Sequence, residues 1–260
     1  LTNNTLKLKN IPKLDDITNM SKLLRSYGAV IKSSKSNLEI KCKNIVNKDA
    51  DYDIVRKMRA SILILGPLLA RFGKARISLP GGCAIGTRPI DIHLEGLKKL
   101  GANFEFENGY VVGNVSKQLV GNQILLPFPS VGATENIMMA ASIAKGKTII
   151  ENAAQEPEIN DLANILNKMG AKINIQKKGL IKIDGVKSLK SASHKIMSDR
   201  IVAGTFIIAA VMLNKNFEIK EIQSDNLEAL TSALIQMGAK LKISTNSIKI
   251  LASKNLHGIK

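Results

Sequence analysis

The stretch from residue 77 to residue 93, ISLPGGCAIGTRPIDIH, brings a thiol, a guanidinium, a carboxyl and an imidazole close together in the sequence. These groups belong to Cys83, Arg88, Asp91 and His93. Glycines on both sides of the cysteine predict an exposed turn, in which a thiol can donate a proton or attack as a thiolate. A buried structural cysteine is the alternative. The residue types therefore predict acid or nucleophilic chemistry beside cationic groups.

Three further positions predict anion binding at helix N-termini. Arg59, Gly132 and Arg200 stand at the same offset before apolar helical patterns, where exposed N–H groups can receive phosphates. Ser130, Val131 and Gly132 form a small-residue helix entry. Each candidate has a structural alternative: a solvated arginine at Arg59 or Arg200, a core imidazole at His93, a helix cap at Asp91, first-turn acids at Glu156 and Glu158, and a structural thiol at Cys42.

An internal repeat predicts the elements that position these residues. Four segments, SYGAVIK, KLGANFE, KMGAKIN and QMGAKLK, carry glycines at 28, 101, 170 and 238, which are 73, 69 and 68 residues apart. In the first, third and fourth segments, apolar residues eleven, eight, four and one positions before the glycine predict an amphipathic helix that the glycine ends. The second segment is apolar at three of these four positions. Alternation after each glycine predicts a pair of strands.

Each complete unit also begins with a helix and a short strand. The leading helices are predicted in MRASILILGPLLARFG, VGATENIMMAASIAKG and RIVAGTFIIAAVMLNKN. The first unit opens at its strand, NTLKLKNI, so we expect it to lack a leading helix. The pattern predicts an α/β protein built from helix-strand-helix-strand-strand units.

The second unit departs from the others at the candidate chemistry. From the residue before the strand to the first apolar helix position, the other units take 14 residues and this one takes 18 (73–90). His93 stands where the others have methionine or leucine, and Arg88 where they have aspartate or proline. An arginine at a helix N-terminus opposes the helix dipole unless an anion binds there. We therefore expect an anionic ligand.

The composition limits the function classes. The net charge of +17 is typical of nucleic-acid binders, but aromatic residues make up 3% of the chain and the lysines are scattered. An anionic small molecule fits the charge equally well, and we expect no nucleic-acid partner. No apolar run reaches the roughly 18 residues of a membrane span. Two cysteines in 260 residues indicate reduced thiols and a cytoplasmic protein.

The run from Pro80 to His93 closely resembles the signature loop of the UDP-N-acetylglucosamine 1-carboxyvinyltransferase family. KMRASILILGPLLARFG, PSVGATENIMMAA and IIENAAQEPEI are similar to other hallmarks of that family. The resemblance implies an inside-out α/β barrel, in which two domains each stack three repeats. It implies that residues 1–197 form the first barrel domain and 198–260 the first repeat of the second, with the remainder outside this sequence.

The implied reaction transfers the enolpyruvyl group of phosphoenolpyruvate to the 3′-hydroxyl of UDP-N-acetylglucosamine and releases phosphate, the first committed step of peptidoglycan synthesis. Cys83 would protonate phosphoenolpyruvate and carry its covalent adduct, and Arg88 would hold its anionic groups. No metal or cofactor is implied. The implied substrate-binding residues are Arg59, Arg88, Pro89, Ile90, Asp91, Ile92, His93, Phe128, Pro129, Ser130, Val131, Gly132, Glu156, Asp199 and Arg200.

Some family features have no counterpart in these 260 residues. They are a Lys-Asn pair near the N-terminus, an aspartate base and a late phosphate-binding arginine; in addition, Phe128 replaces a lysine of some members. We therefore expect the chain alone to bind weakly and turn over negligibly, with a complementary polypeptide as a further partner. A 5-enolpyruvylshikimate-3-phosphate synthase-like enzyme and a non-catalytic truncated remnant remain the alternatives.

Overall fold

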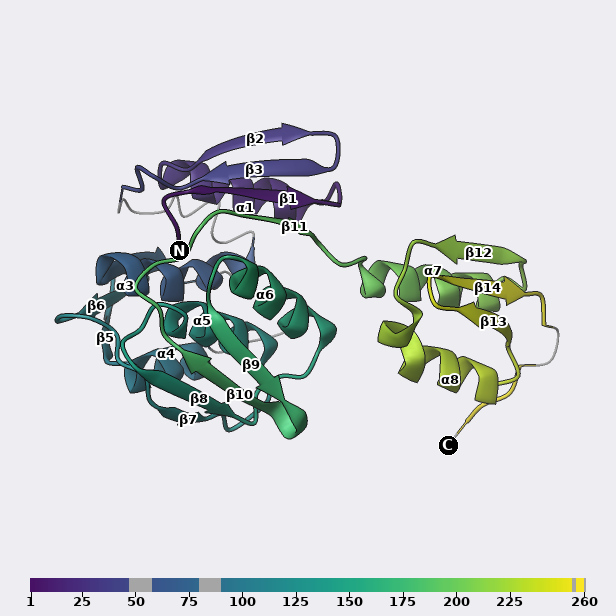
Figure 1. Cartoon of the computed structure of the whole chain (residues 1–260). Coiled ribbons are helices and arrows are strands. Elements are labelled where there is room, and N and C mark those ends of the chain that lie inside the picture. The colour runs from purple at the N-terminus through teal and green to yellow at the C-terminus, as the bar shows by residue number, and fades with distance from the viewer. Residues whose placement is uncertain (47–57, 80–89, 254–255, 260) are drawn as a thin grey trace. The chain divides into compact units, whose positions relative to one another are not determined.

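The computed structural model describes residues 1–46, 58–79, 90–253 and 256–259. The chain divides into two compact units, Leu1–Lys195 and Ile196–Lys260. Each unit is described by itself below, with the element labels of Figure 1.

The first repeat begins at its strand. Its amphipathic helix ends at Ser26, directly before Tyr27 and Gly28. Two antiparallel strands follow, as the alternation of apolar and polar residues predicts. Its elements are β1 (Thr5–Lys9), α1 (Asp15–Ser26), β2 (Val30–Ser34) and β3 (Asn37–Lys41).

The second and third repeats each have the predicted leading helix. The leading helix of the second repeat starts with a 3₁₀ segment, and that of the third is α-helical from its first residue. The second repeat comprises η1 (Arg59–Ile64), α3 (Leu65–Phe72), β4 (Lys74–Ser78), α4 (Asp91–Lys99), β5 (Ala102–Glu107) and β6 (Tyr110–Val115). The third comprises α5 (Val131–Ala141), β8 (Lys147–Glu151), α6 (Pro157–Lys168), β9 (Lys172–Gln176), η2 (Lys177–Gly179) and β10 (Leu180–Asp184), with β7 (Gln123–Leu125) before it and β11 (Ala192–Lys195) after it.

The second compact unit repeats the same order and has its own core. Ile207, Leu234 and Ile248 are buried in that core, which is separate from the core of the first unit. Its elements are α7 (Arg200–Met212), β12 (Phe217–Lys220), η3 (Ser224–Leu227), α8 (Glu228–Gln236), β13 (Lys240–Ser244) and β14 (Ser247–Leu251).

The four repeat glycines end their helices in the predicted conformation. Gly28, Gly101, Gly170 and Gly238 have φ angles of +92°, +100°, +98° and +96°. Residues with a Cβ rarely adopt this left-handed region, which glycine enters without steric penalty. The recurring glycine is therefore explained by one backbone turn used four times, and the prediction from the sequence is confirmed.

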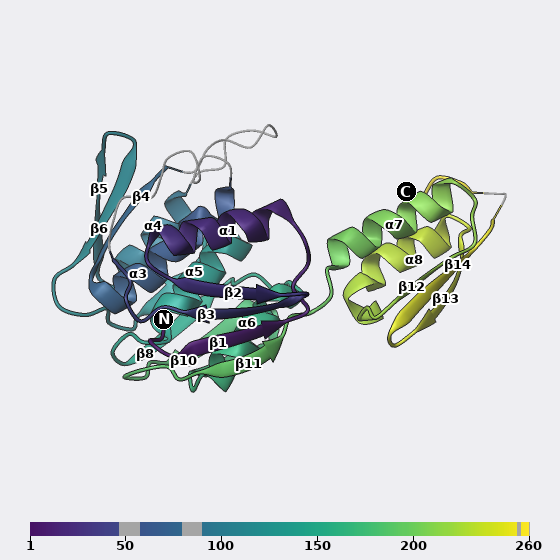
Figure 2. The ribbon, with the colours of Figure 1, turned by 90° about the horizontal axis from the view of Figure 1, so that it is seen from above.

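Inner helices surrounded by separate sheets make up the first unit (Figures 1 and 2). Its sheets have the strand orders β11-β1-β3-β2, β4-β6-β5 and β7-β8-β10-β9. Helix α5 packs against α3, α4 and α6, and its Ile137 and Met138 are fully buried. The expected α/β architecture is confirmed, although within the described residues the strands form separate sheets and not one closed hydrogen-bonded ring.

Two connecting strands link the repeats of the first unit. Strand β7 follows the second repeat but pairs in parallel with β8 of the third. Strand β11 follows the third repeat and pairs in parallel with β1 of the first, with Leu8 opposite His194. The chain therefore returns to its first repeat before it enters the second unit.

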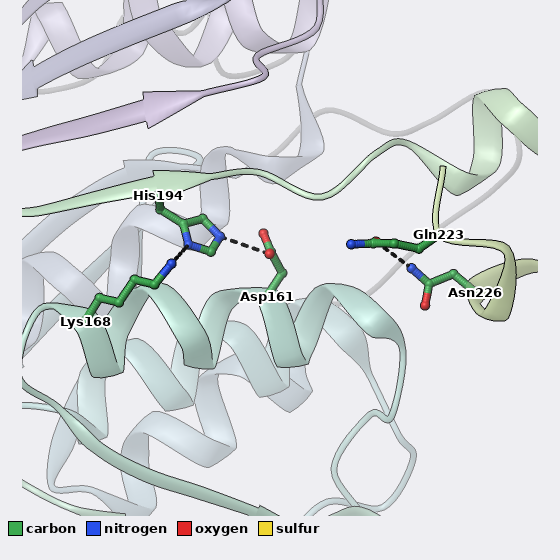
Figure 3. Close-up of polar contacts among 5 residues, drawn as sticks. All are labelled: Asp161, Lys168, His194, Gln223 and Asn226. Atoms are coloured by element: carbon green, nitrogen blue, oxygen red, sulfur yellow. Dashed lines mark hydrogen bonds and ion pairs between the residues drawn. The ribbon is translucent and has the colours of Figure 1, made fainter. Parts of the chain in front are cut away.

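The buried side chain of His194 connects strand β11 to helix α6 through two polar contacts (Figure 3). The His194 Nε2 atom lies 2.9 Å from Asp161 Oδ1, and its Nδ1 atom lies 3.1 Å from Lys168 Nζ. Because an ammonium group can only donate, Nδ1 accepts and Nε2–H donates to the carboxylate.

In the second unit, Asn226 Nδ2 donates to Gln223 Oε1 at 3.0 Å at the start of η3 (Figure 3).

No helix formed by the described residues has both the length and the apolar character needed to cross a membrane.

Candidate active site

The signature loop itself falls between described segments. Cys83, Arg88 and Pro89 lie outside the described residues, and so does the four-residue insertion that the repeat comparison locates there. The structure describes the two ends of this connection. Strand β4 ends at the buried Ser78, and helix α4 begins after the buried Ile90.

Three helix beginnings from two repeats meet next to this connection. His93, in the first turn of α4, is 6% exposed. A methyl group built on Gly132, at the start of α5, would lie 3.1 Å from His93 Cε1 and 3.4 Å from Nε2. Arg59, the first residue of η1, is close enough for its charge to lower the pKa of His93. The structure therefore brings together Arg59, His93 and Gly132, which the sequence singled out separately.

The side chain of Asn136 connects these three elements. Its Oδ1 atom accepts a hydrogen bond from the Gly66 N–H at 2.7 Å, and its Nδ2 donates to the Ile62 carbonyl at 3.0 Å. The same Nδ2 lies 3.2 Å from His93 Nδ1. Asn136 is fully buried, so α5 is joined through it to the leading helix of the second repeat and to α4.

This network determines which ring nitrogen of His93 carries the proton. Because the amide oxygen is engaged by Gly66, the amide nitrogen faces the ring and can only donate, so Nδ1 accepts and Nε2 carries the proton. Burial, and after it the Arg59 charge, lower the pKa of His93 from 6.5 to about 4, against a smaller opposing effect of Asp91. His93 is therefore a neutral imidazole whose N–H faces the start of α5.

The start of α5 presents free backbone donors. Ser130 is the N-cap, and its Oγ accepts a hydrogen bond from the Ala133 N–H at 3.3 Å. Within the described part of the chain, the N–H groups of Val131 and Gly132 have no hydrogen-bond partner. With the Arg59 guanidinium nearby, these two N–H groups form a site whose chemistry suits a phosphate or diphosphate.

The neighbouring candidates occupy several kinds of environment. Ile90 belongs to the core and Ile92 packs against it, so these two side chains support the helix. Asp91 is exposed in the first turn of α4. The alternative that it caps this helix is wrong, because the N-cap is Ile90 and no side chain caps the helix. Phe128, which is 62% exposed, and the exposed Pro129 lead into Ser130 on the approach to α5.

Three acidic side chains lie near one another on α5 and at the start of α6. Glu156 is the N-cap residue of α6, and Glu158 lies in the first turn of that helix. Glu135 projects from α5. Burial, and after it the Glu158 and Glu156 carboxylates, raise the pKa of Glu135 from 4.5 to about 7. The first-turn acids therefore do more than stabilise their own helix, because they also disfavour ionisation of a third carboxyl.

The last two candidates lie in the second compact unit. Asp199 is the N-cap of α7, and its Oδ1 accepts hydrogen bonds from the N–H groups of Ile201 and Val202, both at 2.9 Å. Arg200 is the first residue of that helix and is half-buried. This capping interaction positions the start of α7, the element equivalent to the starts of η1 and α5.

Sequence reasoning missed Asn136, Glu135 and Thr134. Thr134 donates to the Ser130 carbonyl at 2.8 Å and accepts from the Ala154 N–H at 3.1 Å, so it joins α5 to the segment before α6. The available signal was the run Thr-Glu-Asn inside an otherwise small and apolar helix, where polar side chains need buried partners.

Comparison with known proteins gives consistent results. The family model described as EPSP synthase (3-phosphoshikimate 1-carboxyvinyltransferase) matches residues 1–260. The chain is 46% identical over 259 residues to UDP-N-acetylglucosamine 1-carboxyvinyltransferase 1 of Caldanaerobacter subterraneus subsp. tengcongensis, covering 100% of this chain and 62% of the relative. It is 48% identical over 255 residues to UDP-N-acetylglucosamine 1-carboxyvinyltransferase 2 of Carboxydothermus hydrogenoformans, covering 98% and 61%. The chain thus spans about three fifths of the length of these curated relatives.

Solved structures show the same fold at low sequence identity. The enolpyruvyl transferase NikO from Streptomyces tendae superposes with a TM-score of 0.85 at 19% identity, over 96% of this chain and 60% of that chain. EPSP synthase from Acinetobacter baumannii gives a TM-score of 0.74 at 19% identity, over 100% of this chain and 61% of that chain. With the family model matched from end to end, the chain belongs to the EPSP synthase (3-phosphoshikimate 1-carboxyvinyltransferase) family.

Proposed function

We propose that the chain is part of a UDP-N-acetylglucosamine 1-carboxyvinyltransferase. The observation that carries this proposal is the convergence of Arg59, the neutral His93 and the free N–H groups at the start of α5 beside the connection that holds Cys83. The names of relatives that are about 46% identical over the whole chain support it. This is an arrangement suited to a nucleotide-sugar diphosphate.

We propose that this surface binds the nucleotide sugar through the anionic groups of that ligand. Arg59 supplies charge, Val131 and Gly132 supply N–H donors, and the Nε2–H of His93 orients the start of α5. Residues 88–92 and 128–131 approach the same substrate, with Glu156, Asp199 and Arg200 as further contacts in the complete protein. The proposal keeps the division into a first barrel domain, 1–197, and the first repeat of a second, 198–260.

The proposed reaction begins when the Cys83 thiol gives its proton to the methylene carbon of phosphoenolpyruvate. The neighbouring carbon gains oxocarbenium character, and the 3′-hydroxyl of the sugar attacks it and loses its proton to a base. The resulting ketal then loses a methyl proton and inorganic phosphate, which restores the double bond in the enolpyruvyl ether. General acid catalysis of this kind contributes about 10²–10⁴-fold. Arg88 is proposed to hold the anionic groups of phosphoenolpyruvate, in the cytoplasm where a free thiol stays reduced.

Ligand binding by the 260-residue chain tests this proposal without requiring turnover. In calorimetric titrations at low salt, we expect UDP-N-acetylglucosamine to bind and shikimate 3-phosphate to give no heat above dilution. Arg59→Ala should weaken nucleotide-sugar binding about tenfold, because a charge-assisted contact is removed. Lys99→Ala, an exposed cation on α4, should leave binding unchanged.

The titrations also separate the alternatives. Preferential binding of shikimate 3-phosphate would favour the synthase-like enzyme, and binding of neither ligand would favour a non-catalytic remnant. If UDP-N-acetylglucosamine binds, turnover is then measured after mixing with a polypeptide that carries the remaining part of a relative. Restored phosphate release that Cys83→Ser abolishes would support the assigned chemistry.

A further inference from the structure

The outer face of the sheet β11-β1-β3-β2 concentrates positive charge. Side chains along a strand alternate between the two faces of a sheet, and here the inner face is apolar, with Leu6, Leu8, Ile31 and Ile40. The outer face carries exposed charged side chains, which are Lys7, Lys9, Lys32, Lys41, Lys195 and Glu39. We call this outer surface the basic face.

The strand register places these side chains on one side of the sheet. Lys7 and Lys32 both lie opposite Glu39, and Lys9 lies opposite Lys195, and residues opposite each other in paired strands share a face. The four strands lie side by side (Figure 2), so at about 4.8 Å between neighbouring strands the array is roughly 15 Å wide. The Glu39 carboxylate lies 3.3 Å from Lys7 Nζ and is therefore already paired.

The other two sheets of the first unit are more evenly charged on their outer faces. The outer face of β4-β6-β5 has two cations and two acids, which are Lys74, Arg76, Glu105 and Glu107. The outer face of β7-β8-β10-β9 has three lysines and two acids, which are Lys147, Lys172, Lys182, Glu151 and Asp184. The basic face is therefore not a uniform consequence of the net charge of +17.

We propose that the basic face docks on the surface of a bilayer that contains anionic phospholipid headgroups. Charge complementarity supports this partner, because a broad array of lysines meets a plane of phosphate groups whose negative surface potential attracts each ammonium near it. Lysine side chains are flexible point charges, so they can follow a fluid headgroup layer without partners in fixed positions. Contact of this kind holds a protein at the surface and requires no segment to cross the bilayer.

The same face lacks the features that other polyanionic or protein partners require. None of the outward residues of these four strands is aromatic or an arginine, so they offer no ring for base stacking and no guanidinium for bidentate phosphate contacts. Val30 is the sole apolar side chain among these outward residues, whereas protein interfaces bury an apolar centre. A lipid surface therefore fits the basic face better than a nucleic acid or a folded protein.

Vesicle co-sedimentation of the 260-residue chain tests this proposal. The probes are vesicles with about one third phosphatidylglycerol, and vesicles of phosphatidylcholine alone. One variant combines three substitutions on the basic face, Lys9→Gln, Lys32→Gln and Lys41→Gln. Its matched control loses the same charge from the sheet of the third repeat, through Lys147→Gln, Lys172→Gln and Lys182→Gln. Circular dichroism is used to check that both variants are folded.

We expect the parent chain to bind the phosphatidylglycerol vesicles at low salt, to be released at about 0.5 M salt, and to leave phosphatidylcholine vesicles unbound. The basic-face variant should bind about one hundredfold more weakly, because each lysine near an anionic surface contributes roughly fivefold. The control variant should lose less than about fivefold. Glu39→Gln removes the acid of the basic face and should strengthen binding, a gain that misfolding cannot imitate.

Equal losses for the two triple variants, or equal binding to both kinds of vesicle, would overturn the proposal. Binding of a short DNA duplex in place of the vesicles, with the same dependence on the three lysines, would assign the basic face to nucleic acid and would also overturn it. None of these measurements involves UDP-N-acetylglucosamine or Cys83, so their outcome is independent of the proposed transferase function.

Discussion

The amide nitrogen of Asn136 lies 3.2 Å from Nδ1 of His93, while the other contacts of the same side chain reach Ile62 and Gly66. One buried amide therefore fixes the relative positions of the leading helix of the second repeat, α4 and α5. These are the elements that begin at the candidate substrate site. The arrangement makes Asn136 a positioning residue, because it acts on the site through the residues it holds.

Asn136→Ala should destabilise the chain by about 2–4 kcal/mol. The substitution leaves the Gly66 N–H and the His93 Nδ1 atom without their Asn136 partner, whereas the Ile62 carbonyl still accepts from the Leu65 N–H. Each unsatisfied buried group costs about 1–3 kcal/mol. Urea unfolding followed by circular dichroism measures the effect, with Asn164→Ala, an exposed asparagine of α6, as the control. Equal stabilities for the two variants would show that the hydrogen bonds of Asn136 contribute nothing net.

His93 should make folding sensitive to acid. Its pKa in the folded protein, about 4, lies below its ordinary value of 6.5, so the folded state holds the neutral ring and the unfolded state binds the proton more readily. The stability associated with this ring is complete above pH 6.5 and is lost as the pH falls from 6.5 towards 4. The full loss is on the order of 3 kcal/mol.

His93→Gln removes this titration while keeping a hydrogen-bonding side chain. The difference in unfolding free energy between the parent and the variant should therefore shrink as the pH falls from 7 to 5. The ring itself can be observed by nitrogen NMR, which should report a proton on Nε2 throughout this range. A proton on Nδ1, or a difference in stability that does not change with pH, would contradict the assignment.

Close packing between α4 and α5 makes Gly96 sensitive to a single methyl group. A Cβ built on Gly96 would lie 2.1 Å from Cδ1 and 2.7 Å from Cγ1 of Ile137, which is fully buried, so this side chain or the helix must shift within a packed core. Alanine improves helix propensity by up to about 1 kcal/mol, but overpacking costs about 1–3 kcal/mol. We expect Gly96→Ala to lower the free energy of unfolding by about 1–2 kcal/mol, whereas Glu95→Ala, on the exposed side, should change it by less than about 0.5 kcal/mol. A stabilised Gly96→Ala variant would show that α4 and α5 can separate at low cost.

The repeat could be predicted from the sequence because its signals are local. Apolar spacing and a terminal glycine specify each amphipathic helix, and alternation specifies each strand pair, so α1, α4, α6 and α8 all end where expected. The same reasoning placed Arg59, His93 and Gly132 near helix starts.

The network that joins these residues could not be predicted in this way. The partners of Asn136 are 43, 70 and 74 residues away in the sequence, so nothing near Asn136 indicates them. Asp91 shows the opposite case, in which a local rule failed. Its side chain was a reasonable cap, yet the chain enters α4 at Ile90, and the carboxyl stays exposed.

Glu135 should give the chain a second pH dependence, of opposite sign to that of His93. Burial and the carboxylates of Glu158 and Glu156 raise its pKa from 4.5 to about 7, so the folded state favours the protonated carboxyl. The stability from this group is therefore complete below pH 4.5 and is lost as the pH rises through 7. Glu135→Gln keeps the shape of the neutral side chain and should be more stable than the parent by on the order of 2 kcal/mol at pH 8, and by little at pH 5.

The Glu158→Gln variant is the matched control for the cause of this shift. Removing one neighbouring negative charge should lower the pKa of Glu135, so the loss of stability should occur at a lower pH. Glu105→Gln, on the exposed strand β5, should leave the pH of this loss unchanged. Urea unfolding of the four proteins between pH 5 and pH 8 measures these differences. A gain for Glu135→Gln that is the same at pH 5 and pH 8 would mean that the side chain is ionised throughout, and that neither burial nor its acidic neighbours control it.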